Sequence, residues 1–217
     1  MYILLTAATK LEIQPTIDFL NKSGSRAGGH TIQILLTGAG SVATAYRLTR
    51  QIGKSRPDRV LQAGIAGCFT GRKNGELVAV KEEILADLGV WEEGRFKTLF
   101  DMNLAGRNDP PFTNGGLVNP FEEILSASGL EAVRSVSVNE ISTLPDRIGW
   151  YQQNWSPVVE NMEGGAFHYV CIGENIPFLQ LRSISNRVGE RDKSKWDFPA
   201  AVHSLNEKLI SLLPDLR

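Results

Sequence analysis

Carboxylates at the starts of helices are the first candidates for chemistry in this sequence. Glu12 closes the segment AATKLE (residues 7–12), at the start of a predicted helix and just after the first apolar run. Helix-start amides and partial desolvation can tune the pKa of a carboxylate in such a position. The simpler interpretation of Glu12 is a solvated acid in the first turn of a helix.

Glu163 opens another predicted helix, and the residues that follow it are all small. Gly164, Gly165 and Ala166 leave room for a ligand to approach the backbone. Close packing of the helix against a neighbouring element explains the same residues equally well. Glu163 is therefore a candidate site residue only in combination with other signals.

Two glycine-rich turns follow predicted strands. The first, TGAGSVA (residues 37–43), matches the Gly-x-Gly-x-x-Ala variant of the dinucleotide-binding fingerprint. That fingerprint also needs an acidic residue at the end of the next strand, whereas Asp58 precedes the strand. We therefore expect no nicotinamide or flavin cofactor. The second turn, AGIAG (residues 63–67), suggests that the two turns form the floor of a small-ligand site.

The elements that must position these residues alternate between short apolar runs and helical patterns. This alternation predicts an α/β fold around a mostly parallel or mixed sheet. The predicted strands are residues 3–5, 32–36, 59–63, 76–80, 133–138 and 177–181. The predicted helices are residues 12–22, 41–52, 162–174 and 199–213.

Two polar stretches interrupt this alternation. Residues 89–120 are rich in turn-forming residues and read as a long excursion, which in compact domains is often a lid or a binding loop. Residues 186–195 (NRVGERDKSK) follow the last predicted strand directly. Because ligands in open α/β sheets bind beyond the carboxyl ends of the strands, we expect this second stretch to line a site.

Composition excludes several classes of protein. The 217 residues, 42% of them hydrophobic, suit one domain over residues 1–217. A formal net charge of -1 offers no excess of cations for nucleic acid or an anionic membrane. No signal peptide or membrane span is recognisable, so we expect a cytoplasmic protein. Cys68 and Cys171 fit neither a disulfide framework nor a zinc site, and we expect reduced thiols and no metal.

Five segments taken in order carry a resemblance to a known family. They are an Ala-x-x-x-Glu ending at Glu12, the two glycine turns, the Glu-x-Met-Glu of residues 160–163, and the Arg-x-Ile-Ser-x of residues 182–186. Over nearly the whole chain, this order resembles the methylthioadenosine/adenosylhomocysteine nucleosidases and related phosphorylases. The resemblance implies a three-layer α/β/α fold with a central twisted mixed sheet, a homodimer or larger homo-oligomer, and no metal or organic cofactor.

The same resemblance implies roles for individual residues. Glu12 would activate the attacking water, Met162 would pack on the sugar of a nucleoside substrate, and Glu163 would accept its hydroxyl hydrogens. Cleavage of a ribosyl C–N bond builds positive charge on the sugar, so nearby carboxylates favour the transition state. Further substrate contacts are expected from Gly64, in the second glycine turn, and from Ile141, in the purine-loop region of residues 138–143.

Asn186 departs from the adenine-specific members of the family, which carry aspartate in the corresponding Ile-Ser-Asp. An amide can donate to O6 and accept from N7–H of a 6-oxopurine, whereas the amino group of adenine would face the amide donor with a donor of its own. Mispaired buried polar groups can cost selectivity on the order of 10⁴. Asn186 therefore favours hypoxanthine over adenine, although a loop or helix-cap asparagine is the plainer alternative.

Among the nucleosidases, three segments resemble the futalosine hydrolases: residues 86–89 (ADLG), 159–164 (VENMEG) and 182–186 (RSISN). The resemblance implies hydrolysis of futalosine, with release of hypoxanthine, in a route to menaquinone. Arg182 would support Glu163 or Glu12, or serve as a structural ion-pair partner. Arg191 would meet the carboxylate of the distal benzoate.

Hydrolysis is favoured over phosphorolysis because Ile65 stands where related nucleosidases carry a serine, and no arginine precedes Arg26. Second in rank is an adenine-releasing nucleosidase acting on methylthioadenosine, adenosylhomocysteine or aminodeoxyfutalosine. Phosphorolysis of inosine ranks third. A nucleotide-binding module without catalysis is the alternative from another class, since glycine turns alone would suffice for it.

Overall fold

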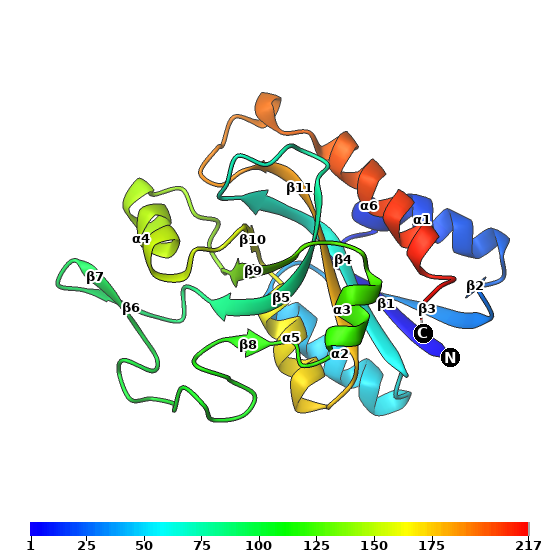
Figure 1. The fold of residues 1–217 in the computed structure, drawn as a ribbon, viewed down its shortest axis with the longest axis horizontal. Helices are drawn as coiled ribbons and strands as arrows, with labels where there is room; N and C mark the ends of the chain where they lie inside the picture. Colours follow the sequence, from blue (N-terminus) through cyan, green and yellow to red (C-terminus); the bar gives the residue numbers. More distant parts are fainter. Residues whose placement is uncertain (217) are drawn as a thin grey trace.

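The computed structural model describes residues 1–216, in which helices separate most of the central strands, and β4 to β8 follow one another without a helix between them (Figure 1). The strands are β1 (Tyr2–Ala7), β2 (Arg26–Ala27), β3 (His30–Leu36), β4 (Arg59–Cys68), β5 (Leu77–Leu85), β6 (Gly89–Glu92), β7 (Arg95–Thr98), β8 (Leu117–Val118), β9 (Ala132–Ser137), β10 (Val159–Asn161) and β11 (Phe178–Arg187). The helices are α1 (Lys10–Lys22), α2 (Ser41–Lys54), α3 (Glu122–Ala127), α4 (Pro145–Trp155), α5 (Gly164–Gly173) and α6 (Phe198–Leu212). Each predicted strand and helix overlaps one of these.

The central sheet is mixed, as expected. Its strand order is β10-β9-β5-β11-β4-β1-β3-β2, and β8 pairs with β5. The neighbours β3, β1, β4 and β11 run parallel, while β5 runs antiparallel to β11. Strand β10 pairs with β9 and also, antiparallel, with β4. The sheet therefore curls back on itself at this end. The predicted second glycine turn is wrong, because residues 63–67 belong to β4, which continues to Cys68 and pairs with β11 along this stretch.

Helices cover both faces of the sheet and complete the three layers (Figure 1). On one face, side chains of α1 and α6 pack on β1, β4 and β11 in a cluster that includes Leu5, Leu181 and Leu209. On the other face, α2 and α5 pack on the opposite sides of the same strands, with Leu48 and Phe167 against Phe178. Strands buried on both sides explain why β4 and β11 read as nearly continuous apolar runs.

The pairing of β4 with β11 sets the carboxyl-end geometry of the sheet. Arg182 lies opposite Gly64, and Asn186 lies opposite Gly67. The register shifts between Ile184 and Asn186, which is a β-bulge. Bulges re-aim side chains at the rims of sheets, and this one falls where the last strand reaches the candidate site.

Residues 89–120 contain more structure than a loop. Strands β6 and β7 form a hairpin, and Trp91 and Phe96 of this hairpin contact Trp150 of α4 at ring-centroid distances of 6.0 and 5.5 Å. Aromatic contacts therefore fix the excursion against a helix that the sequence patterns did not predict. Within residues 1–216, we find no helix that is both long and apolar enough to span a bilayer.

Candidate active site

A pocket of about 360 Å³ opens at the carboxyl ends of β4, β10 and β11. This volume lies within the range of roughly 300–1,000 Å³ typical of small-molecule sites. Its lining combines carboxylates and amides with an apolar rim: Ala8, Thr9, Leu11, Glu12, Ala39, Ile65, Ala66, Gly67, Ile141, Glu160, Asn161, Met162, Glu163, Ser185, Asn186, Val188, Gly189, Glu190, Trp196 and Phe198.

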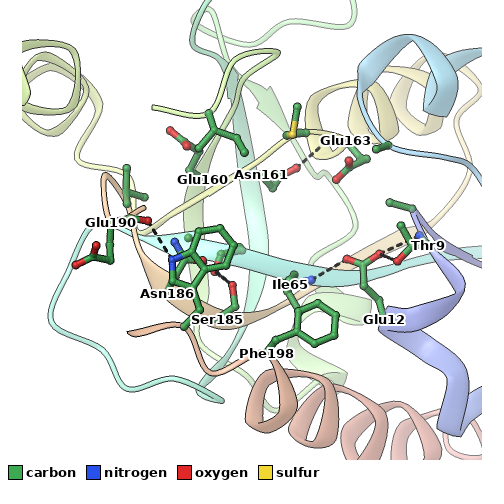
Figure 2. A pocket seen from close by; sticks show the side chains of 18 of the residues that line it. Thr9, Glu12, Ile65, Glu160, Asn161, Glu163, Ser185, Asn186, Glu190 and Phe198 are labelled. Carbon is green, nitrogen blue, oxygen red and sulfur yellow. Dashed lines mark hydrogen bonds between the residues drawn. The ribbon is translucent and has the colours of Figure 1, made fainter. Parts of the chain in front are cut away.

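Glu12 is buried at the start of α1 and faces the pocket (Figure 2). Its Oε2 accepts hydrogen bonds from the backbone N and Oγ1 of Thr9, both at 2.9 Å, in a capping box. Its Oε1 accepts from the backbone N of Ile65 at 3.2 Å. Glu12 is thus held from two elements, and Oε1 keeps a lone pair for a further donor.

Glu163 lies at the N-cap of α5, and its carboxylate is held by the first glycine turn. The backbone N of Gly40 donates to Oε1 at 3.0 Å, and Gly40 has φ +88°, a conformation that glycine adopts without strain. On its other side, Oε2 lies 3.6 Å from Nη1 of Arg182. The turn that resembled a dinucleotide fingerprint therefore orients a carboxylate. Asp58, the acidic residue that precedes the next strand, lies away from this turn at the opposite end of the strands, where it accepts from the backbone N of Tyr2.

Asn186 lies at the other end of the pocket from Glu12 and Glu163 (Figure 2). Its Oδ1 accepts from Oγ of Ser185 at 2.7 Å, and its Nδ2 donates to the carbonyl of Arg187 at 2.9 Å. These two bonds fix the orientation of the amide. One hydrogen of Nδ2 and one lone pair of Oδ1 are left for a ligand.

Five predicted site residues surround this one pocket: Glu12, Ile141, Met162, Glu163 and Asn186. They come from segments that lie up to 174 positions apart in the sequence, and the carboxyl ends of the strands bring them together. Val188, Gly189 and Glu190 of the second polar stretch also contribute to the lining, whereas none of the described residues 89–120 does. The excursion is therefore not a lid over this pocket within one chain.

Three predicted contact residues do not line the pocket, and each has a physical reason. Arg182 is almost completely buried, and its Nη2 donates to Oε1 of Gln62 and Oδ1 of Asn161, both at 2.9 Å. Gly64 lies directly against the guanidinium of Arg182. A Cβ at this position would collide with Nη1 of Arg182 and lie 3.1 Å from Oε1 of Glu12. Arg191 lies outside, with its guanidinium 5.5 Å from the ring centroid of Trp196.

Glu160 is a pocket residue that sequence reasoning passed over, although it lies in the same motif as Met162 and Glu163. Its Oε1 accepts from the backbone N of Ser142 at 3.0 Å, which ties β10 to the purine-loop segment. Its Oε2 is buried and has no hydrogen-bond partner among the described residues. Burial is the main cause that raises the pKa of this carboxyl group.

The charge of the lining is one-sided. Four carboxylates line the pocket, from Glu12, Glu160, Glu163 and Glu190. Its lining within residues 1–216 includes no lysine, arginine or histidine. Arg182, beneath the floor, offsets part of the negative charge at the Glu163 end. Beside Glu12 and Glu163, such a lining stabilises a group that becomes positively charged and disfavours an anion, whereas Glu190 at the rim is paired with Lys195 at 2.8 Å.

Comparisons with known proteins agree with this geometry. The phosphorylase superfamily profile matches residues 23–214. A futalosine hydrolase of Thermus thermophilus is 29% identical, and the alignment covers 98% of this chain and 95% of that protein. A 5'-methylthioadenosine/S-adenosylhomocysteine nucleosidase of Haemophilus influenzae is 27% identical, with coverage of 84% and 78%.

Solved structures share the fold at lower sequence identity. The futalosine hydrolase of Helicobacter pylori superposes with a TM-score of 0.82 at 17% identity and covers 100% of this chain and 98% of its own. The 5'-methylthioadenosine/S-adenosyl homocysteine nucleosidase of Campylobacter jejuni gives the same TM-score and identity, with full coverage of both chains. The expected phosphorylase-like fold is thereby confirmed.

Proposed function

Because the chain belongs to the phosphorylase superfamily, we propose that it is a purine nucleosidase that hydrolyses the N-glycosidic bond of futalosine. The products would be hypoxanthine and dehypoxanthine futalosine, in a route to menaquinone. The observation that carries the proposal is the joint placement of two acids at one end of a pocket and an amide at the other. The relatives named futalosine hydrolase support the choice of substrate.

At the sugar end, the two acids divide the work. Glu163 accepts the hydrogens of the ribose hydroxyls, and its bond from Gly40 keeps the carboxylate aimed at them. Glu12 takes a proton from water through the free lone pair of Oε1. As the C–N bond breaks, its electron pair leaves with the purine, and both carboxylates stabilise the positive charge on the sugar while Met162 packs against the ring. Water then adds to C1′, and the proton that it loses to Glu12 passes through solvent to the purine anion, which returns Glu12 to its ionised form.

Water is the better nucleophile for this site. Phosphate carries two negative charges near neutral pH and would enter a pocket whose lining, among residues 1–216, supplies four carboxylates and no cationic side chain. Arg182 lies below the floor, where its Nη2 donates to Gln62 and Asn161 and its Nη1 lies 3.6 Å from Oε2 of Glu163. A phosphorylase of inosine is therefore disfavoured by electrostatics.

At the base end, Asn186 is the group that selects the purine. Its free N–H and free lone pair match O6 and N7–H of hypoxanthine.

The second candidate function is that of an adenine-releasing nucleosidase, because a 5'-methylthioadenosine/S-adenosylhomocysteine nucleosidase aligns over 84% of the chain. We also propose that the chain forms a single domain and assembles as a homodimer or larger homo-oligomer, as the family resemblance implies.

Chromatography of the released purine tests this function. Futalosine, aminodeoxyfutalosine, methylthioadenosine and inosine are each incubated with the protein, with and without phosphate. We expect hypoxanthine from futalosine, at a rate that does not depend on phosphate. Release of adenine would establish the second candidate, and dependence on phosphate would make the protein a phosphorylase.

The variant Glu12→Gln separates an enzyme from a binding module. It keeps the hydrogen-bond acceptor for Ile65 N–H but removes the base, so we expect at least a 100-fold loss of kcat with nucleoside binding retained. Calorimetry measures binding, and release of the purine measures turnover. Wild-type protein that binds nucleosides without turnover would identify a module.

A further inference from the structure

A buried carboxylate outside the pocket terminates two chains of hydrogen bonds from the start of α5. Glu83, on β5, is completely buried and does not line the pocket. Its Oε1 accepts from Nδ2 of Asn161 and Nε2 of Gln180, both at 2.7 Å. Its Oε2 accepts from Oγ of Ser137 at 2.9 Å. Both oxygens of Glu83 are therefore occupied by side-chain donors.

Each chain continues to the first N–H groups of α5. Oδ1 of Asn161 accepts from the backbone N of Glu163 at 3.0 Å and of Gly164 at 2.6 Å. Oγ of Ser137 accepts from the backbone N of Gly165 at 2.6 Å. These are donors that a helix start leaves without intrahelical partners. Asn161 and Ser137 thus connect the first N–H groups of α5, through hydrogen bonds, to the two oxygens of Glu83.

We propose that Glu83 is a positioning residue for Glu163. By accepting from Nδ2 of Asn161, Glu83 sets the orientation of that amide, so that Oδ1 points toward the start of α5. By accepting from Ser137, it directs the hydroxyl lone pairs to Gly165. Glu163 is the N-cap of α5, so these bonds set where its carboxylate lies in the pocket. The inference rests on the proposed role of Glu163 as the residue that holds ribose.

The chemistry of the network explains why a carboxylate occupies this place. All three of its partners donate, and an ionised carboxylate is an acceptor at every lone pair. A glutamine at position 83 would present its NH₂ group to one donor in either orientation. Gly164 allows the close approach, because a Cβ there would collide with Oε1 of Glu83 and lie 2.5 Å from Nε2 of Gln180.

The surroundings of Glu83 act on its carboxyl group in opposing directions, and burial prevails, so that the pKa is raised overall. Burial raises the pKa of this carboxyl group, while hydrogen bonds from Gln180, Asn161 and Ser137 and the positive charge of Arg182 act in the opposite direction. Arg182 also donates to Oδ1 of Asn161 at 2.9 Å, so the cation and the carboxylate hold the same amide from opposite ends. Removal of the carboxylate would leave Nδ2 of Asn161 with only its 2.9 Å bond to Oγ of Ser135 and so weaken the hold on that amide.

The first test measures the preference for ribose in Glu83→Gln. Release of the purine from a ribonucleoside is compared with release from its 2′-deoxy and 3′-deoxy analogues. If Glu83 acts through Glu163, kcat/KM for the ribonucleoside falls by roughly 10–100-fold, while an analogue that lacks the hydroxyl held by Glu163 loses about threefold or less. Equal losses on all three substrates would overturn the proposal.

The matched control is Glu82→Gln. Glu82 is the preceding residue on β5, and its Oε2 pairs with Nε of Arg134 at 2.7 Å, on the other side of the strand and away from Asn161. The variant Glu82→Gln removes the same charge from the same strand, so we expect its preference for the ribonucleoside over the deoxy analogues to equal that of the wild type. A loss in this control as large as that in Glu83→Gln would also contradict a specific role.

The second test does not depend on activity. Amide hydrogen exchange at Glu163, Gly164 and Gly165 is measured in both variants and in Ser137→Ala, which leaves the charge of Glu83 in place. We expect exchange at least tenfold faster at these amides in Glu83→Gln, and faster exchange mainly at Gly165 in Ser137→Ala.

Unchanged amide exchange in the folded variants would overturn the proposal that Glu83 positions the start of α5. If Glu83→Gln does not fold, Glu83→Asp, which keeps the charge on a shorter side chain, takes its place, because Ser137→Ala removes the acceptor of Gly165 directly and reports on Ser137 alone. Wild-type protein that cleaves no nucleoside would sink the proposed function instead, and the exchange data would still decide whether Glu83 orders the start of α5.

Discussion

At the scale of the single residue, Glu12 combines a structural and a chemical task. Its Oε2 closes the capping box of α1 with Thr9, which satisfies backbone donors at the start of the helix. Its Oε1 faces β4 through Ile65 and keeps one lone pair. The interpretation of Glu12 as a solvated first-turn acid is wrong, because the residue is buried. A capping role in the first turn and a role in the site are compatible, because each uses a different oxygen.

Asn186 is the residue on which the identity of the released base depends. In Asn186→Asp, the donor toward O6 of hypoxanthine is lost, and the carboxylate faces the carbonyl of Arg187 that Nδ2 now binds. We expect the ratio of hypoxanthine to adenine release, measured from futalosine and aminodeoxyfutalosine, to fall by about 100-fold or more. Asn154→Asp, on the exposed surface of α4, is the control and should leave the ratio unchanged. A ratio equal to wild type in both variants would mean that another group selects the purine.

At the scale of the element, the start of α5 shows why its residues are small. A Cβ at Gly164 would collide with Glu83, whereas one at Gly173, at the other end of the helix, would meet nothing within 4 Å. Gly164→Ala should therefore destabilise the fold by about 1–3 kcal/mol through overpacking and displaced hydrogen bonds. Gly173→Ala should be neutral or stabilising by up to about 1 kcal/mol, because glycine is a poor helix former. Urea unfolding measures both, and equal effects would contradict this account of packing.

Local patterns predicted the elements that carry the site. The apolar runs of β1 and β11 were sufficient to bring Glu12 and Asn186 to the same edge of the sheet, whereas Glu163 follows β10, a strand that was not predicted. The β10–β4 pairing depends on a three-residue strand, and α4 carries mixed polar and aromatic residues, so neither gives a clear period.

Contacts between distant segments were not predictable from the sequence. Arg182 and Gly64 lie in the expected motifs, yet one guanidinium occupies the space above one glycine and thereby removes both from the pocket lining. The network around Glu83 joins four strands and the start of a helix. No residue spacing in the sequence predicts these side-chain contacts, because they depend on the strand order of the folded sheet.

At the scale of the whole molecule, buried titratable groups link stability to pH in opposite directions. Burial raises the pKa of Glu83 and Glu160. Their contributions to stability are fully present below the ordinary value of about 4.5 and are lost as pH rises through the folded-state pKa. Burial lowers the pKa of His168 from 6.5 to about 3. Its contribution is therefore present above pH 6.5 and is lost as pH falls toward 3.

His168 allows this linkage to be measured in isolation. It is completely buried beside Phe178, and its Nδ1 lies 2.9 Å from the carbonyl of Leu117, so it stays neutral while the unfolded chain takes up a proton. The difference in unfolding free energy between wild type and His168→Gln should shrink by about 2 kcal/mol between pH 7 and pH 5, at about 1.4 kcal/mol per pH unit below 6.5. His203→Gln is the control for the loss of an exposed histidine, since the side chain of His203 is 72% exposed. Parallel pH curves for wild type and His168→Gln would show that the interior accommodates the charged imidazole, which would contradict the apolar packing on which the central sheet and α5 depend.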